Sequence, residues 1–210
     1  PHPVAGDGAG AGARDGLTAV STVIFAERYD MPNEKFRDRY RIPSARLAGW
    51  DYAKPGWYFV TICTHKRNHY FGEVVDAANK GAEMALSPIG QIALQEIVLL
   101  RDRRPHVLID TFVIMPNHVH FLLKLRTPEN LQPAAGHTLR ANSLGAIIGQ
   151  WKAGVTRSIS IAGHADFAWQ DRYHDKVIRY AVGLEEIRVY IRNNPHQWYR
   201  DRNNKPGVYM

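Results

Sequence analysis

The chain has 210 residues and a mass of 23.8 kDa, which is enough for one domain with a substantial core. Apolar residues make up 45% of it, and no run approaches the roughly 18 apolar residues of a membrane span, so neither a disordered chain nor a membrane protein is expected. The formal net charge of +7 and the pI near 9.6 favour a polyanionic partner, most simply nucleic acid. A single cysteine, Cys63, cannot form an internal disulfide, which fits a cytoplasmic protein.

The first 30 residues differ in composition from the rest of the chain. They begin PHPVAGDGAGAGARDG, and they hold two basic and four acidic residues, the reverse of the overall balance. A stretch rich in Gly and Ala buries too little apolar surface to offset its ordering entropy. We therefore expect residues 1–30 to be a poorly ordered appendage and residues 31–210 to form the domain.

The first predicted elements are a strand, a helix and a strand pair. WYFVTICTH (57–65) is rich in β-branched and aromatic residues, as strands are. SPIGQIALQEIVLLRDR (87–103) has a serine N-cap candidate, a proline at the first helical position and apolar residues at helical spacing. VLIDTFVIMP (107–116) and HVHFLLKL (118–125) predict two strands joined by a tight turn at 115–117.

Two further helices are predicted towards the C-terminus. LGAIIGQWKAGVTRSIS (144–160) has an amphipathic pattern, and GLEEIRVYIRNNP (183–195) predicts a last helix closed by Pro195. A short strand near Phe167–Gln170 would complete the order strand, helix, strand, strand, helix, strand. That order predicts an α+β fold with a split βαβ, ferredoxin-like or RRM-like antiparallel sheet.

His118 and His120 are separated by one residue on a predicted strand. Because side chains alternate along a strand, both imidazoles should project to the same side, where they could hold one divalent cation. The alternative is two incidental histidines on a half-buried strand. Other proteins with this spacing fit poorly, since zinc hydrolases continue to xDH and histidine-triad hydrolases need a histidine where Leu122 stands.

Downstream, Tyr173 lies among polar residues in FAWQDRYHDKVIR, at a position that the pattern assigns to the start of a helix. A phenol can attack a phosphodiester if a nearby metal polarises the phosphate and a base or water takes the proton. The alternative is an aromatic residue that caps the edge of the core.

Taken together, these segments resemble the REP-associated tyrosine transposases, a branch of the HUH single-strand endonucleases. The resemblance covers most of residues 39–200, and the elements MPNHVH and WQxRY carry it in that order, together with IIGQWKAGVTRSI and YIRNNPHQW. It implies a central antiparallel sheet with helices packed on one face and the histidines on a middle strand.

The resemblance also implies a function. It implies a single-stranded DNA endonuclease and strand transferase that cleaves and rejoins DNA near hairpins such as repetitive extragenic palindromes. His118 and His120 match the histidines that bind Mg²⁺ or Mn²⁺, and Tyr173 matches the nucleophile that forms a 5′-phosphotyrosine link. No nucleotide cofactor is expected, and no GxxxxGK[ST] motif is present. The protein would act as a monomer or homodimer, with Tyr173 serving its own chain's histidines or a partner's.

The third metal ligand is the point where this chain departs from the family. In related transposases it comes from a polar residue on the helix that bears the tyrosine, and members near this sequence often read YxDH. Here Tyr173 is followed by His174, Asp175 and Lys176, so either Asp175 or His174 is the candidate ligand. The lysine favours an alternative function, a non-catalytic module that binds nucleic acid hairpins with a lapsed metal site.

Basic residues on the predicted helices and loops are candidate phosphate contacts, although each could equally be a solvated surface charge. The candidates for DNA binding are Lys152, Arg157, Arg172, Arg179 and Arg192.

Overall fold

The structure is a computed structural model that describes residues 46–77, 81–127, 142–201 and 204, together with two short strands, β1 (Lys35–Phe36) and β2 (Arg39–Tyr40). The chain divides into two units, Pro1–Pro43 and Ser44–Met210. In the first unit, β1 pairs with β2 in antiparallel fashion. The prediction for residues 1–30 concerns a segment outside the described residues. Within the described part, no helix is both long and apolar enough to cross a membrane.

The second unit is built on a four-stranded antiparallel sheet in the order β6-β7-β3-β8. Its strands are β3 (Gly56–Cys63), β6 (Val107–Met115), β7 (His118–Leu125) and β8 (His174–Ile178). Helix α2 (Pro88–Arg103) lies between β3 and β6 in the chain, and α3 (Leu144–Ile161) lies between β7 and β8. This is the predicted ferredoxin-like βαββαβ order, and the α+β class is confirmed.

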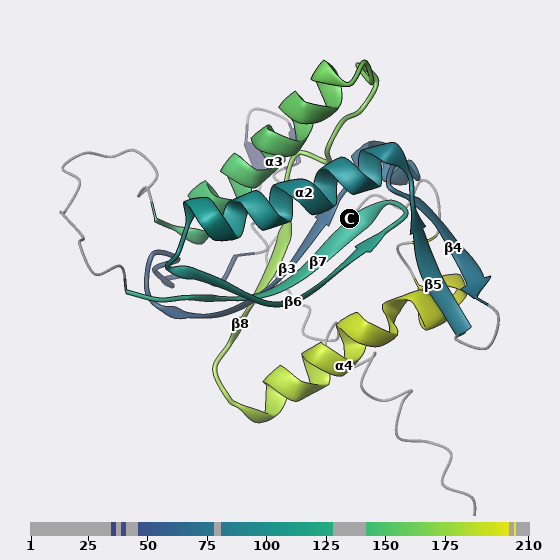
Figure 1. Cartoon of the computed structure of the whole chain (residues 1–210). Helices are drawn as coiled ribbons and strands as arrows, with labels where there is room; N and C mark the ends of the chain where they lie inside the picture. The colour runs from purple at the N-terminus through teal and green to yellow at the C-terminus, as the bar shows by residue number, and fades with distance from the viewer. Residues whose placement is uncertain are drawn as a thin grey trace, which may run out of the picture. The chain divides into compact units, whose positions relative to one another are not determined.

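The two faces of the sheet are covered by different helices (Figure 1). Helices α2 and α3 pack on one face, whereas α4 (Val182–Gln197) packs on the other. The expectation that helices lie on one face therefore holds for α2 and α3 but not for α4. The reason is that α4 buries its own apolar side, which includes Ile187 and Ile191, on the second face of the sheet.

Three local features differ from the prediction. Residues 72–86 form a separate hairpin of β4 (Gly72–Ala77) and β5 (Gly81–Leu86). The residues after Tyr173 form strand β8 rather than a helix, because their main chain pairs with the free edge of β3. The short strand near Trp169 is only an isolated bridge to Thr64.

The remaining short elements are two 3₁₀ turns, η1 (His65–Arg67) and η2 (Trp198–Arg200).

Local sequence explains where the two main helices begin. The Ser87 hydroxyl accepts the Gly90 N–H at 3.0 Å, which caps α2. The Ser143 hydroxyl accepts the Ala146 N–H at 3.3 Å and caps α3 in the same way. Pro195 lies inside α4, near its end, so it does not close that helix as predicted.

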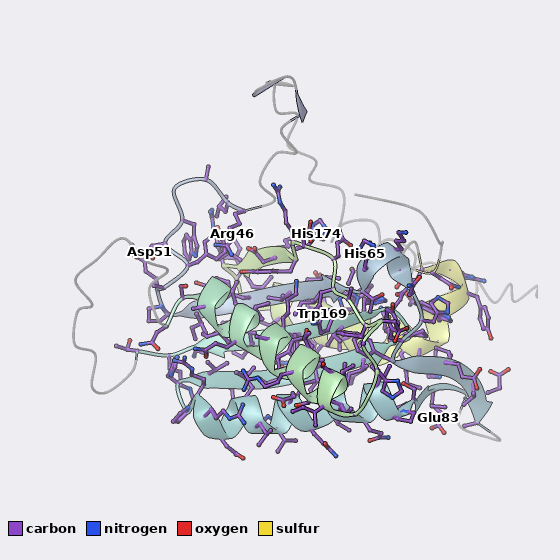
Figure 2. The ribbon with its side chains drawn as sticks, turned by 90° about the horizontal axis from the view of Figure 1, so that it is seen from above. Arg46, Asp51, His65, Glu83, Trp169 and His174 are labelled. Carbon is purple, nitrogen blue, oxygen red and sulfur yellow. The ribbon has the colours of Figure 1, made fainter. Side chains whose placement is uncertain are left out.

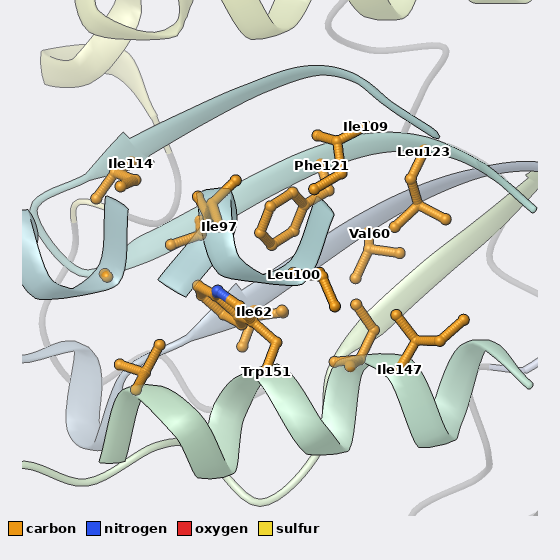
Figure 3. Packing of buried hydrophobic residues seen from close by; sticks show 14 of the residues in the cluster. Val60, Ile62, Ile97, Leu100, Ile109, Ile114, Phe121, Leu123, Ile147 and Trp151 are labelled. Atoms are coloured by element: carbon orange, nitrogen blue, oxygen red, sulfur yellow. The ribbon is translucent and has the colours of Figure 1, made fainter. Parts of the chain in front are cut away.

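The main hydrophobic core lies between the sheet and the pair α2 and α3 (Figure 3). Trp151 of α3 meets Phe121 of β7 edge to face, with ring centroids 5.1 Å apart. Ile147, one turn earlier on α3, has no solvent exposure. Alternate side chains of β3 and β7 therefore enter this core, and the intervening ones face α4.

Two isoleucines on α3 allow a matched test of this packing. Ile147→Ala should lower the free energy of unfolding by about 2–5 kcal/mol, because it leaves a cavity in the core. Ile161→Ala, at a side chain that is 81% exposed, should change it by less than about 0.5 kcal/mol. Urea unfolding measures both values, and similar losses in the two variants would contradict the described packing.

Candidate active site

The two histidines of β7 lie side by side under α4. In the register between β3 and β7, Cys63 is opposite His118 and Thr61 is opposite His120. Both imidazoles are fully buried, and their Nε2 atoms are 3.1 Å apart. They project to the same side of the sheet, as the strand alternation requires. This geometry brings two nitrogen donors to one point.

The other nitrogen of each imidazole meets a polar neighbour. His118 Nδ1 lies 2.9 Å from the Asn117 side-chain oxygen, and His120 Nδ1 lies 2.8 Å from the Thr61 hydroxyl. Burial, followed by the positive charges of His120 and Arg67, holds the pKa of His118 well below its usual range. His118 is thus neutral at neutral pH, which is the form that can bind a metal.

Tyr190 of α4 is the tyrosine at this site. Its hydroxyl lies 3.4 Å from His120 Nε2, and its ring centroid is 5.4 Å from that of His120. The ring also meets Phe59 edge to face, so the side chain is held between α4 and β3. Reasoning from the sequence missed Tyr190, although YIRNNP was part of the resemblance.

Two oxygen donors complete the surroundings of the histidines. Asn194, one helical turn after Tyr190, lies near enough to His118 to raise its pKa slightly against the effect of burial, but its buried Oδ1 makes no hydrogen bond of good geometry among the described residues. The Asp201 carboxylate and the two imidazoles have ligand atoms within 4.8 Å of one another. Imidazole nitrogens with carboxylate or amide oxygens form a donor set that suits a divalent cation. The cluster is therefore compatible with a divalent metal.

A bidentate ion pair anchors α4 to the sheet. Arg188 donates from Nε and Nη2 to the two carboxylate oxygens of Asp110, at 2.8 and 3.0 Å. Asp110 lies at the irregularity in β6 between Ile109 and Thr111. Because Arg188 is two residues before Tyr190, this pair helps fix the helix that carries the site tyrosine.

Tyr173 does not lie at the histidines. Its hydroxyl accepts a hydrogen bond from Arg46, in the segment before β3 (Figure 2), and its ring packs against the core on the α2 and α3 side. Burial raises its pKa to about 12, against the effect of Arg46. The expectation that the Tyr173 hydroxyl faces the histidine pair is therefore wrong within one chain, because the residues that follow it form strand β8 and its side chain packs on the core face of the sheet.

The two candidates for the third metal ligand, Asp175 and His174, also lie away from the histidine pair. Asp175 is opposite Val60, a core residue, so its carboxylate faces away from the histidines. Its pKa is raised by burial, which outweighs the nearby Tyr52 hydroxyl and Arg46. His174 is opposite Thr61 and so shares the histidine face, but two strand spacings, about 10 Å, separate its backbone from that of His120.

The five basic candidates do not form one surface around the histidines. Lys152 and Arg157 line a shallow groove of about 560 Å³ on α3, together with Trp169, which Figure 2 labels. Arg179 lies over the Trp50 ring, and Arg192 pairs with Glu185 at 2.8 Å. Arg172 lies in the segment before β8.

The fold and site define an α+β protein with a buried histidine pair, a tyrosine and a carboxylate under its last helix. The chain is 31% identical over 168 residues to an uncharacterized protein of Haemophilus influenzae, which covers 76% of this chain and 91% of the relative. The chain belongs to the same family as that protein. No family model matches the sequence.

Two solved structures are similar to this chain at 18% identity. One is a REP-associated tyrosine transposase bound to a REP hairpin, with a TM-score of 0.49 over 79% of this chain and 91% of that one. The other is a proposed transposase from Deinococcus radiodurans, with a TM-score of 0.38 over 70% of this chain and 95% of that one.

The burial of His118 predicts how stability depends on pH. In metal-free protein the unfolded chain takes up a proton at this imidazole near pH 6.5, whereas the folded chain does not, because its pKa is depressed. The contribution to stability is complete above pH 6.5 and is lost as the pH falls, by at most about 1.4 kcal/mol per pH unit. His118→Gln should therefore have a shallower slope of unfolding free energy between pH 6.5 and 5.

The matched control is His65→Gln, which removes an exposed imidazole. Equal slopes for His118→Gln and the wild type would show that His118 takes up a proton in the folded state.

Proposed function

We propose that this protein is a single-stranded DNA endonuclease and strand transferase of the tyrosine transposase type, which cleaves and rejoins DNA near hairpins such as repetitive extragenic palindromes. The observation that supports it most is the Tyr190 hydroxyl beside His120 in a site that also holds His118. The resemblance in MPNHVH and YIRNNPHQW and the net charge of +7 agree with a DNA substrate.

His118 and His120 would hold the cation, Mg²⁺ or Mn²⁺, together with an oxygen of Asn194 or Asp201. Asn194 fits the resemblance, which implies a polar ligand on the helix that bears the tyrosine. Its unpartnered buried oxygen would gain a partner in such a complex. When bound, the cation would polarise a phosphate oxygen and stabilise the charge that develops on it.

Tyr190, rather than Tyr173, is the proposed nucleophile. Its oxygen forms a bond to the scissile phosphorus while the bond from phosphorus to the 3′-oxygen breaks, which leaves a 5′-phosphotyrosine link and a free 3′-hydroxyl. The phenolic proton passes to a base or water at the site, and the departing 3′-oxygen takes up a proton. Attack by a 3′-hydroxyl on the tyrosine link reverses these steps, so rejoining needs no nucleotide cofactor.

Access to this site requires movement. His118 and His120 have no solvent exposure, and Trp198 of η2 lies over His118 with ring centroids 6.0 Å apart. A phosphate can reach the histidines only after side chains that cover them, such as Trp198, move aside. We expect DNA binding to be accompanied by such an opening.

The two tyrosines can be separated by a matched pair of variants. Tyr190→Phe should keep hairpin binding but lose the covalent adduct, because the attacking oxygen is removed. Tyr173→Phe should retain the adduct, because its hydroxyl bonds to Arg46 on the other face of the sheet. A labelled hairpin incubated with Mn²⁺ and run on a denaturing gel shows the adduct, and a mobility shift shows binding.

The opposite result, an adduct in Tyr190→Phe but none in Tyr173→Phe, would identify Tyr173 as the nucleophile, supplied by a partner chain. A wild-type protein that binds the hairpin without forming any adduct would indicate the non-catalytic binding module. Cleavage without an adduct in Tyr190→Phe would make metal-activated water the nucleophile.

A further inference from the structure

The two hydrogen bonds at the Nδ1 atoms of His118 and His120 differ in one respect, which is whether donor and acceptor can exchange roles. Asn117, at the turn between β6 and β7, donates from its side-chain nitrogen to the Arg67 carbonyl oxygen at 3.2 Å. Its amide is thereby oriented so that its oxygen faces His118 Nδ1 at 2.9 Å. An amide oxygen only accepts, so His118 must carry its proton on Nδ1. In neutral His118, Nε2 then has a lone pair and no hydrogen.

The turn that supplies the Arg67 carbonyl is itself tightly held. Arg67 is buried, and its backbone is in the left-handed region at φ 59°. Its guanidinium donates to Cys63 Sγ at 2.9 Å, and the Thr64 main-chain N–H donates to the Asn117 carbonyl oxygen at 2.9 Å. These contacts hold the Arg67 carbonyl in place and so keep the Asn117 amide in one orientation, which favours the Nδ1–H tautomer of neutral His118.

His120 has a different neighbour on Nδ1. Its Nε2 is 3.1 Å from His118 Nε2, and two lone pairs would repel each other at that distance, so the proton between them belongs to His120. In neutral His120, Nδ1 then accepts from the Thr61 hydroxyl at 2.8 Å. Unlike the Asn117 oxygen, a hydroxyl can both donate and accept.

We infer that Thr61 is a positioning residue that lets His120 exchange tautomers, while Asn117 keeps His118 in a single one. For both Nε2 lone pairs to face one cation, His120 must give up its Nε2 proton and carry one on Nδ1 instead. The Thr61 hydroxyl then rotates from donor to acceptor. The Nε2 proton passes to water as the cation enters, and Nδ1 takes up a proton from water, so the imidazole stays neutral and the pair releases no net proton.

This inference rests on the proposed cation site, and Zn²⁺ is a suitable probe because it binds imidazole and is diamagnetic. Nitrogen NMR of the histidine rings in the full chain reports which nitrogen carries each proton. In metal-free protein, the protons should lie on His118 Nδ1 and His120 Nε2. With Zn²⁺, both should lie on Nδ1. A proton on His120 Nδ1 before Zn²⁺ is added would overturn the inference, whether or not any variant folds.

Calorimetry with Zn²⁺ tests the role of the hydroxyl directly. Thr61→Val keeps the side-chain shape and should weaken binding by about 10–100-fold, because the Nδ1 proton would meet a methyl group. Thr61→Ser should restore most of the affinity. Thr111→Val removes a hydroxyl from β6 of the same sheet and should leave the affinity unchanged.

The outcomes separate this inference from the proposed function. If Thr61→Val bound Zn²⁺ as tightly as the wild type, the exchange through Thr61 would be wrong and the cation site would stand. If wild-type protein bound no Zn²⁺ at His118 and His120, the proposed cation site would be wrong and the exchange with it.

Discussion

In the ladder between β3 and β7, Thr61 lies directly opposite His120, and Cys63 lies opposite His118. A shift of this register by one residue would change which side chains face each other across the two strands and would break the contact between Thr61 and His120. Val60 and Phe121, directly opposed in the same ladder, bury their side chains between the sheet and α3. Burial of these apolar side chains therefore fixes the register of β3 and β7, and the register sets which polar side chains meet on the other face.

Placing two imidazoles in full burial is costly unless their polar atoms are satisfied. On the α4 face the imidazole nitrogens have polar neighbours from three separate parts of the chain, which are Thr61 on β3, Asn117 at the turn and Tyr190 on α4. The Asn194 oxygen is a remaining unsatisfied polar atom next to them. A buried site of imidazole nitrogens with a nearby amide oxygen that lacks a hydrogen-bond partner among the described residues is suited to receiving a cation.

Helix α4 carries both the proposed nucleophile, Tyr190, and a proposed cation ligand, Asn194. Its residues Tyr190 and Asn194 lie one turn apart on one helix face, so a single helix presents a hydroxyl and an amide oxygen to the histidines. The pair of Arg188 and Asp110 holds the same helix to β6. Small displacements of α4 would change the position of both groups together, which suits the opening that the proposed function requires.

The sequence alone determined the elements whose signals are local. Apolar spacing predicted α2 and α3, with a serine cap for α2, and β-branched and aromatic composition predicted β3. The turn at Pro116 predicted the strand pair β6 and β7, and the period of two placed His118 and His120 on one side. The polar run around Tyr173 resembles a helix start, but pairing with the free edge of β3 makes the residues after it a strand, so within one chain Tyr173 lies away from the histidines. Tyr190 and Asn194, one turn apart in a predicted helix, were a signal that could have been used. Which face α4 covers, and the meeting of Asp201 with the histidines, depend on contacts between distant segments, so only the tertiary structure decided them.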